Sequence, residues 1–141
     1  MLVTDGRGIP IGLHLESAQQ AEITLARITL ETVHVQPARG RPRTRPQHLV
    51  ADKGYDSRDF RRYLHRRGIG HTIPPIRRRG KRRHGQPRPA DPVRYAQRWI
   101  IERTNAWLQN YRRVQTRHER LLSNYRAFVV LACILITLRN L

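Results

Sequence analysis

The stretch from Arg77 to Pro89 constrains the fold more than any other part of this sequence. It is a run of arginine and lysine among glycine, proline and other polar residues. Because a segment of this composition cannot bury apolar surface, we expect residues 77–89 to form a basic surface insertion that stays disordered until it meets an anion. The core must then come from the residues on either side. The basic side chains are Arg77, Arg78, Arg79, Lys81, Arg82, Arg83 and Arg88.

Strand-like and helical patterns alternate on both sides of this insertion, without an internal repeat or a domain boundary. The sequence therefore predicts one α/β domain over residues 1–141. Asp5-Gly6 favours a hairpin turn, Ser57 and Gly68 favour the two ends of a helix, and Asp91-Pro92 favours a helix start. The expected strands are 1–4, 9–15, 48–51 and 69–73, and the expected helices are 19–33, 58–67, 91–108 and 123–138.

The C-terminal apolar run and the single cysteine bear on the compartment. Phe128 to Leu138 is apolar except for Thr137. This run is shorter than the roughly 20 residues of a membrane span, so it predicts a buried helix and no membrane partner. The first residues lack the pattern of a signal peptide. Cys133 is the only cysteine, which excludes a disulfide within the chain and fits a reducing cytoplasm.

The charge balance points to a polyanionic partner. Twenty-eight Lys and Arg face ten Asp and Glu, which gives a formal net charge of +18. Nearly all of these cations are arginine, whose planar guanidinium suits phosphate oxygens, so nucleic acid is favoured over an acidic membrane surface. An arginine-rich composition also arises from a high-GC genome, but the clustering of the charge favours nucleic-acid binding.

Two acidic residues are the candidates for chemistry. Asp52 follows the apolar run Leu49-Val50-Ala51, and open sheets place functional side chains at such strand ends. A turn containing Gly54 is the simpler alternative. If residues 91–108 form one helix, Tyr95, Arg98, Glu102 and Gln109 lie on one side of it, within about 60° of arc. That stripe is either functional or a solvated face that holds an ordinary Arg98–Glu102 pair.

These residues resemble a known family. Ala51-Asp52-Lys53-Gly54-Tyr55-Asp56-Ser57 looks like the second-aspartate region of bacterial insertion-sequence transposases of the DDE class. Tyr95-x2-Arg98-x3-Glu102 is similar to their tyrosine–arginine–glutamate signature, which continues to a lysine seven positions after the glutamate. Gln109 stands at that position here. The resemblance covers nearly the whole chain, including Asp5 to Pro10 and the closing apolar helix.

The resemblance implies an RNase H-like fold, a mixed sheet flanked by helices, and DNA transposition as the function. It implies that Asp52 and Glu102 are the second and third catalytic acids and hold Mg²⁺ or Mn²⁺. Tyr95 and Arg98 would contact phosphate near the cut, while Gln109 can donate a hydrogen bond but brings no charge. The partner would be the double-stranded DNA of transposon ends, also held by residues 77–83 and by Arg112 and Arg113.

The family's first aspartate has no match in this sequence, since Asp5 fits a turn residue. We therefore expect the C-terminal part of a transposase catalytic domain, without its N-terminal strand, in the cytoplasm at the nucleoid. We expect this chain alone to be inactive in strand cleavage and to be marginally stable or associated, as a homodimer or with a full-length transposase. The alternative function is a non-catalytic DNA-binding remnant that interferes with a full-length enzyme.

Overall fold

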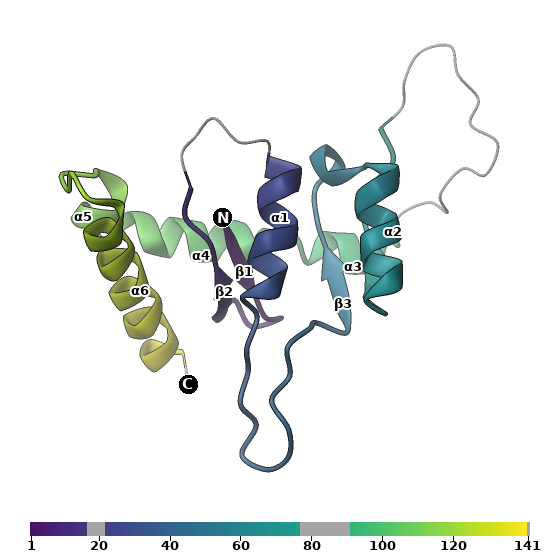
Figure 1. Ribbon diagram of the computed structural model, residues 1–141, viewed down its shortest axis with the longest axis horizontal. Helices are drawn as coiled ribbons and strands as arrows, with labels where there is room; N and C mark the ends of the chain where they lie inside the picture. The colour runs from purple at the N-terminus through teal and green to yellow at the C-terminus, as the bar shows by residue number, and fades with distance from the viewer. Residues whose placement is uncertain (17–21, 77–90, 141) are drawn as a thin grey trace. The chain divides into compact units, whose positions relative to one another are not determined.

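The computed structural model describes residues 1–16, 22–76 and 91–140. The chain divides into two compact units, one formed by Arg45–Arg98 and the other by Met1–Thr44 together with Trp99–Leu141 (Figure 1). Each unit contains a two-stranded sheet and helices. The α/β class predicted from the sequence is therefore confirmed. The predicted basic insertion at residues 77–89 lies outside the described residues.

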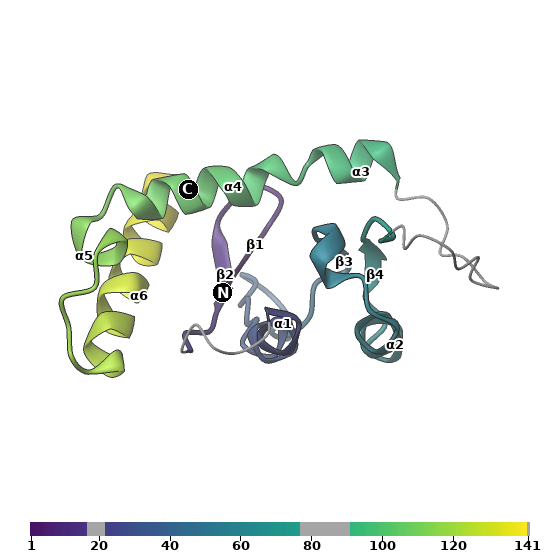
Figure 2. The same cartoon turned by 90° about the horizontal axis from the view of Figure 1, so that it is seen from above.

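The unit formed by Arg45–Arg98 is built on a strand–helix–strand segment. The strands β3 (His48–Val50) and β4 (Gly70–Thr72) pair in parallel, and α2 (Arg58–Arg66) lies between them in the sequence. A short 3₁₀ helix, η1 (Lys53–Tyr55), follows β3. In Figure 2, α2 lies on one side of the strands and α3 (Pro92–Ala96) on the other. The core of the unit is apolar and at most 2% exposed, and it consists of Phe60, Leu64, Ile69 and Ile73.

Local signals set the ends of the helices in this unit. The Ser57 hydroxyl accepts a hydrogen bond from the Phe60 amide at 3.1 Å, which satisfies a free N–H of the first turn of α2. Gly68 follows the helix with a φ of 65°, a conformation that glycine adopts easily. The Asp91 side chain accepts from two amides at the start of α3, directly before Pro92. The predicted caps and the predicted end of α2 are confirmed.

The other unit contains an antiparallel hairpin between two helices. The strands β1 (Leu2–Thr4) and β2 (Pro10–Leu13) form the hairpin, with α1 (Glu22–Glu31) on one side and α4 (Trp99–Gln109) on the other (Figure 2). Asp5 Oδ1 accepts hydrogen bonds from the amides of Arg7 and Ile9, both at 2.9 Å. Asp5 therefore has the turn role predicted for it.

The hairpin turn packs closely against α4 at Gly8, where there is no room for a side chain. Gly8 has a φ of 89°, and a Cβ at this position would lie 2.8 Å from Thr104 Oγ1. The Thr104 hydroxyl donates to the Gly8 carbonyl oxygen at 2.8 Å, and Thr104 is fully buried. The turn and the helix therefore approach each other more closely than a larger residue would allow.

The sheet arrangement supports only the general fold class. The described strands form one antiparallel pair and one parallel pair, and the two pairs belong to different units. Both pairing types of a mixed sheet are thus present, but a single mixed sheet is not formed by the described residues. The RNase H-like fold stays a prediction.

The C-terminal helix α6 (Leu122–Arg139) is buried on one side only. Val129, Ala132 and Ile136 are at most 3% exposed, and the last two pack with Leu108 of α4. The prediction of a buried helix is wrong for the other side, because α6 packs mainly on α4, α5 (Arg112–Gln115) and β2 and leaves large apolar side chains exposed. Its exposed large apolar residues include Val130, Leu131, Ile134, Leu135 and Leu138. By length and composition alone, this 18-residue helix could cross a membrane, and 17% of it is buried.

Candidate active site

Asp52 lies at the end of β3, as the sequence predicted. The parallel pairing continues to Ala51, whose amide donates to the Thr72 carbonyl oxygen at 3.1 Å. Asp52 then caps η1, where its Oδ1 accepts from the Lys53 amide, and the residue is exposed. A strand end and a short helix therefore fix the backbone of Asp52, while its carboxylate remains open to solvent.

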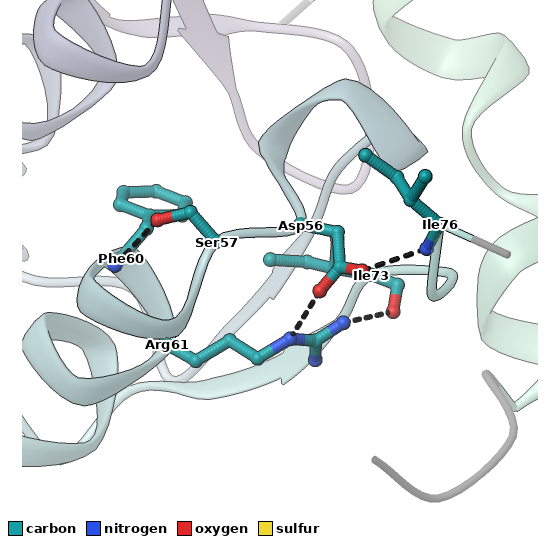
Figure 3. A network of polar contacts seen from close by, with 6 residues as sticks. All are labelled: Asp56, Ser57, Phe60, Arg61, Ile73 and Ile76. Atoms are coloured by element: carbon teal, nitrogen blue, oxygen red, sulfur yellow. Dashed lines mark hydrogen bonds and ion pairs between the residues drawn. The ribbon is translucent and has the colours of Figure 1, made fainter. Parts of the chain in front are cut away.

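Asp56 of the same motif has a structural role that sequence reasoning missed. Arg61 Nε donates to Asp56 Oδ1 at 2.9 Å, and the Ile76 amide donates to Asp56 Oδ2 at 2.7 Å (Figure 3). Arg61 Nη2 also donates to the Ile73 carbonyl oxygen at 2.7 Å. The Asp56 side chain is 3% exposed and that of Arg61 is 17% exposed. This network joins the start of α2 to the chain that leaves β4.

A second polar network holds β3 from its other end. Arg94 Nη1 lies 2.9 Å from His48 Nδ1, and His48 Nε2 lies 2.9 Å from Thr72 Oγ1. Because arginine only donates, His48 accepts at Nδ1 and carries its proton at Nε2, so it donates to Thr72. Burial, followed by the charge of Arg94, lowers the pKa of His48. The network connects α3 to the strand that leads to Asp52, and no spacing in the sequence indicates it.

The helix predicted over residues 91–108 is interrupted, so the prediction of one continuous helix is wrong, and the site residues assigned to it stay a prediction. α3 ends at Ala96, α4 begins at Trp99, and the amides of Gln97 and Arg98 donate to carbonyl oxygens three residues earlier. Such tight bonds are typical of a helix end. A helical wheel drawn through residues 95–109 therefore does not describe this segment. No proline or glycine marks the interruption in the sequence.

The interruption also divides the predicted site residues between the two units. Tyr95 and Arg98 belong to the unit Arg45–Arg98, where the Arg98 guanidinium lies 5.9 Å from the centroid of the Tyr95 ring. Glu102 and Gln109 belong to the other unit and are exposed on α4. Glu102 lies in the first turn of α4, where the helix dipole favours a carboxylate. Asp52 and Glu102 are thus in different units.

The predicted DNA-binding arginines differ in their surroundings. Arg112 is exposed on α5. Arg113 Nη1 donates to Glu119 Oε1 at 2.8 Å, and this hydrogen bond lowers the pKa of Glu119. The Arg113 guanidinium also lies 5.2 Å from the centroid of the Phe128 ring. Arg113 therefore has local partners, whereas the basic residues predicted within 77–83 lie outside the described residues.

The donor chemistry of the two candidate acids suits a divalent cation, but their number is small. Asp52 and Glu102 are exposed and present hard oxygen donors. Among residues 1–16, 22–76 and 91–140, no group of three or more His, Cys, Asp or Glu is placed to hold a metal ion. The two acids account for two ligating residues at most, each with one or two oxygen donors.

The residues above define an α/β protein with a strongly basic composition and a solvent-facing carboxylate after a parallel strand. The chain matches the family model of the transposase DDE domain over residues 1–137, and it belongs to that family. It is 35% identical over 136 residues to a transposase for the insertion sequence element IS402 of Burkholderia cepacia. The match covers 96% of this chain and 60% of that protein. No solved structure matches the chain.

Family membership confirms the resemblance inferred from the motifs. The match extends across both compact units, so the residues before and after the interruption at Gln97 and Arg98 belong to the same family domain. DDE transposases act on DNA as nucleases and strand transferases and use divalent metal. The chain spans about 60% of the length of the curated relative it matches.

Proposed function

We propose that this chain serves DNA transposition, and that Asp52 and Glu102 are two of the carboxylates that act on the ends of a transposon. The family match supports the reaction class. The observation that carries the choice of residues is the contrast within one motif. Asp56 is buried in an ion pair, whereas Asp52 is exposed at the end of a parallel strand. Only Asp52 is free to meet a ligand from solvent.

The proposed metal is Mg²⁺ or Mn²⁺, held by the oxygens of Asp52 and Glu102. When bound, such an ion lowers the energy of the charge that develops as a phosphodiester is cut. The protein's own part is positional. The pairing of β3 with β4 and the capping of η1 fix Asp52, and the first turn of α4 fixes Glu102.

The proposed DNA contacts are Tyr95, Arg98 and Gln109. Arg98 can bind a phosphate with its planar fork while its face lies near the Tyr95 ring. Gln109 is exposed near the end of α4 and would donate a hydrogen bond where the family pattern has a lysine. Residues 77–83, Arg112 and Arg113 would add sequence-independent contacts to the phosphate backbone.

The fold that would bring the two acids together is RNase H-like. A two-stranded sheet is only marginally stable by itself. The described strands supply both a parallel and an antiparallel pair. In that fold, carboxylates from strands and from one helix meet at one edge of a mixed sheet. We propose transposon-end DNA as the partner, with a homodimer or a full-length transposase as the assembly, at the nucleoid in the cytoplasm.

We further propose that this chain alone is inactive in strand cleavage. A two-metal site needs more than two carboxylates, and Asp52 and Glu102 are the two whose motifs match the family. The second candidate function follows from the same observation. A chain with a net charge of +18 can bind DNA without cutting it and so interfere with a full-length transposase.

A distance measurement tests the central proposal. Spin labels at D52C and E102C, in a C133S background, should lie close enough for one metal site once label length is allowed for. A matched pair, D59C with E102C, moves the first label to an exposed acid on the outer side of α2. If labels at 52 and 102 lie further apart than one metal site and the two label lengths allow, Asp52 and Glu102 do not share a metal.

Substitution separates the two candidate functions. Glu102→Ala should abolish any Mn²⁺-dependent nicking of terminal-repeat DNA by an assembly that contains this chain. It should leave DNA affinity unchanged or slightly higher, because it removes a negative charge near phosphate. Loss of DNA binding together with nicking would contradict the assigned role of Glu102. Mn²⁺-dependent nicking by the chain alone would refute the proposal that it is inactive by itself.

A further inference from the structure

α2 carries a basic stripe on the side opposite its core. At about 100° per residue, Arg58, Arg62 and Arg66 lie within about 80° of arc. We call these three residues the α2 arginine stripe. All three residues are exposed. Phe60 and Leu64, which are 0% exposed, lie on the opposite side of the helix. The core therefore fixes which side of α2 faces solvent.

The stripe does little for the stability of the helix. Arg62 Nη1 lies 3.7 Å from Asp59 Oδ1, and both side chains are largely exposed. Within the part of the chain that the structure describes, the side chains of Arg58 and Arg66 make no hydrogen bond, ion pair or ring contact. Like charges at i and i+4 destabilise a helix, and the stripe contains two such pairs. Local structure therefore gives no reason for three arginines on this side.

We propose that the α2 arginine stripe binds the phosphate backbone of double-stranded DNA. This inference rests on the proposed function and adds a surface to it. From Arg58 to Arg66 the helix rises by about 12 Å, which matches the axial rise of three to four base pairs at about 3.4 Å each. The guanidinium fork suits phosphate oxygens. The stripe contacts no base, so it adds affinity without reading sequence.

The helix that carries the stripe is held firmly. Its first turn is capped by Ser57, and its core side packs in the unit Arg45–Arg98. Arg61 of the same helix is bonded to Asp56 and to the Ile73 carbonyl oxygen (Figure 3). Three arginines on a rigid helix lose less conformational freedom on binding than the same residues in a loop.

An anionic membrane is the other polyanion that such a stripe could meet, and the structure favours DNA. A helix that lies on a membrane needs large apolar side chains exposed beside its cations. The large apolar residues of α2, Phe60 and Leu64, are both fully buried. The exposed side of α2 offers charge without an apolar surface to insert.

The test compares two triple variants of equal charge by their binding to a mixed-sequence 20-base-pair duplex. The first is R58Q/R62Q/R66Q, and the matched control is R39Q/R126Q/R139Q, which removes three exposed arginines elsewhere. The plot of log K against log salt has a negative slope, and each lost phosphate contact reduces the magnitude of that slope by about one. The stripe variant should therefore reduce the magnitude by about 2 to 3. The control should lower it by less than about one.

Further measurements keep the inference falsifiable. The melting temperature of the stripe variant should be unchanged or higher, because like charges are removed. R58K/R62K/R66K, which keeps the charge, should retain most of the slope. Equal slopes for the two glutamine variants would overturn the inference. So would a stripe variant that loses binding to phosphatidylserine vesicles but not to DNA. If the unmodified chain does not bind the duplex at all, the proposed function fails first.

Discussion

Asp52 and Asp56 stand in one motif, separated by a single turn of 3₁₀ helix, and have opposite environments. Asp56 is 3% exposed and accepts from Arg61 and from the Ile76 amide. Asp52 caps the start of η1 and faces solvent. A sequence motif that contains two acids therefore has one that holds the fold and one that is open to chemistry. Substitutions in this motif and in the residues around it test that division.

Asp56→Ala should have the largest effect on stability. It leaves the largely buried Arg61 guanidinium without its counter-charge and the Ile76 amide without its acceptor. Breaking one side of a buried ion pair lowers the free energy of unfolding by about 3 to 5 kcal/mol. Urea denaturation followed by circular dichroism measures it. The matched control Asp52→Ala should cost less than about 1 kcal/mol, and similar losses for both would abolish the contrast.

Ser57→Ala tests the residue that follows Asp56. The serine hydroxyl accepts from the Phe60 amide at the first turn of α2. Its removal should lower the free energy of unfolding by about 1 kcal/mol, and Ser57→Asn should restore most of this loss. The same denaturation experiment applies. An unaffected Ser57→Ala variant would mean that the buried Asp56–Arg61 pair holds the start of α2 without help from the cap.

The lowered pKa of His48 predicts that the free energy of unfolding falls in acid. Burial and then Arg94 lower its folded-state pKa, so the unfolded chain binds the proton more readily. The stabilisation is complete above the unfolded pKa of about 6.5 and is lost as the pH falls through that value toward the folded pKa. His48→Gln should make the fall in unfolding free energy between about pH 7 and pH 5 shallower. An unchanged slope would contradict this assignment.

Asp52→Asn should have the smallest effect on stability. An exposed carboxylate is replaced by an amide that can still accept from the Lys53 amide, so the unfolding free energy should change by no more than about 0.5 kcal/mol. Mn²⁺ binding, measured by titration calorimetry on an assembly that contains the chain, should weaken at least tenfold. Asp59→Asn is the control, since that acid is exposed on α2. Equal metal affinity in both variants would remove Asp52 from the proposed site.

Local signals in the sequence were sufficient to predict the turns and helix starts that depend on only a few neighbouring residues. The hairpin turn at Asp5, the start of α2 at Ser57 and the start of α3 at Asp91 were all predicted, because each depends on a side chain that bonds to its own neighbouring backbone. The strand that ends before Asp52 was predicted for a similar reason. The motifs around Asp52 and Glu102 also identified the family.

Long-range packing decided what the sequence pattern left open. The Asp56–Arg61 pair depends on the carbonyl oxygen of Ile73 and the amide of Ile76, which reach it only through the fold. The segment around Gln97 and Arg98 has the composition of a continuous helix but is interrupted. α6 is apolar around most of its circumference, so its composition could not show which side would be buried.

The family, the helix caps and the hairpin turn follow from the sequence alone, because each depends on residues that are close along the chain. The folded structure was needed to show that the Asp56 side chain is buried while Asp52 faces solvent, and that Tyr95 and Glu102 belong to different compact units. Burial accounts for the difference between the two acids. Arg61 is close to Asp56 along the chain, but the Ile73 carbonyl oxygen and the Ile76 amide that complete its surroundings come from further along, and residue type and spacing do not specify where they lie.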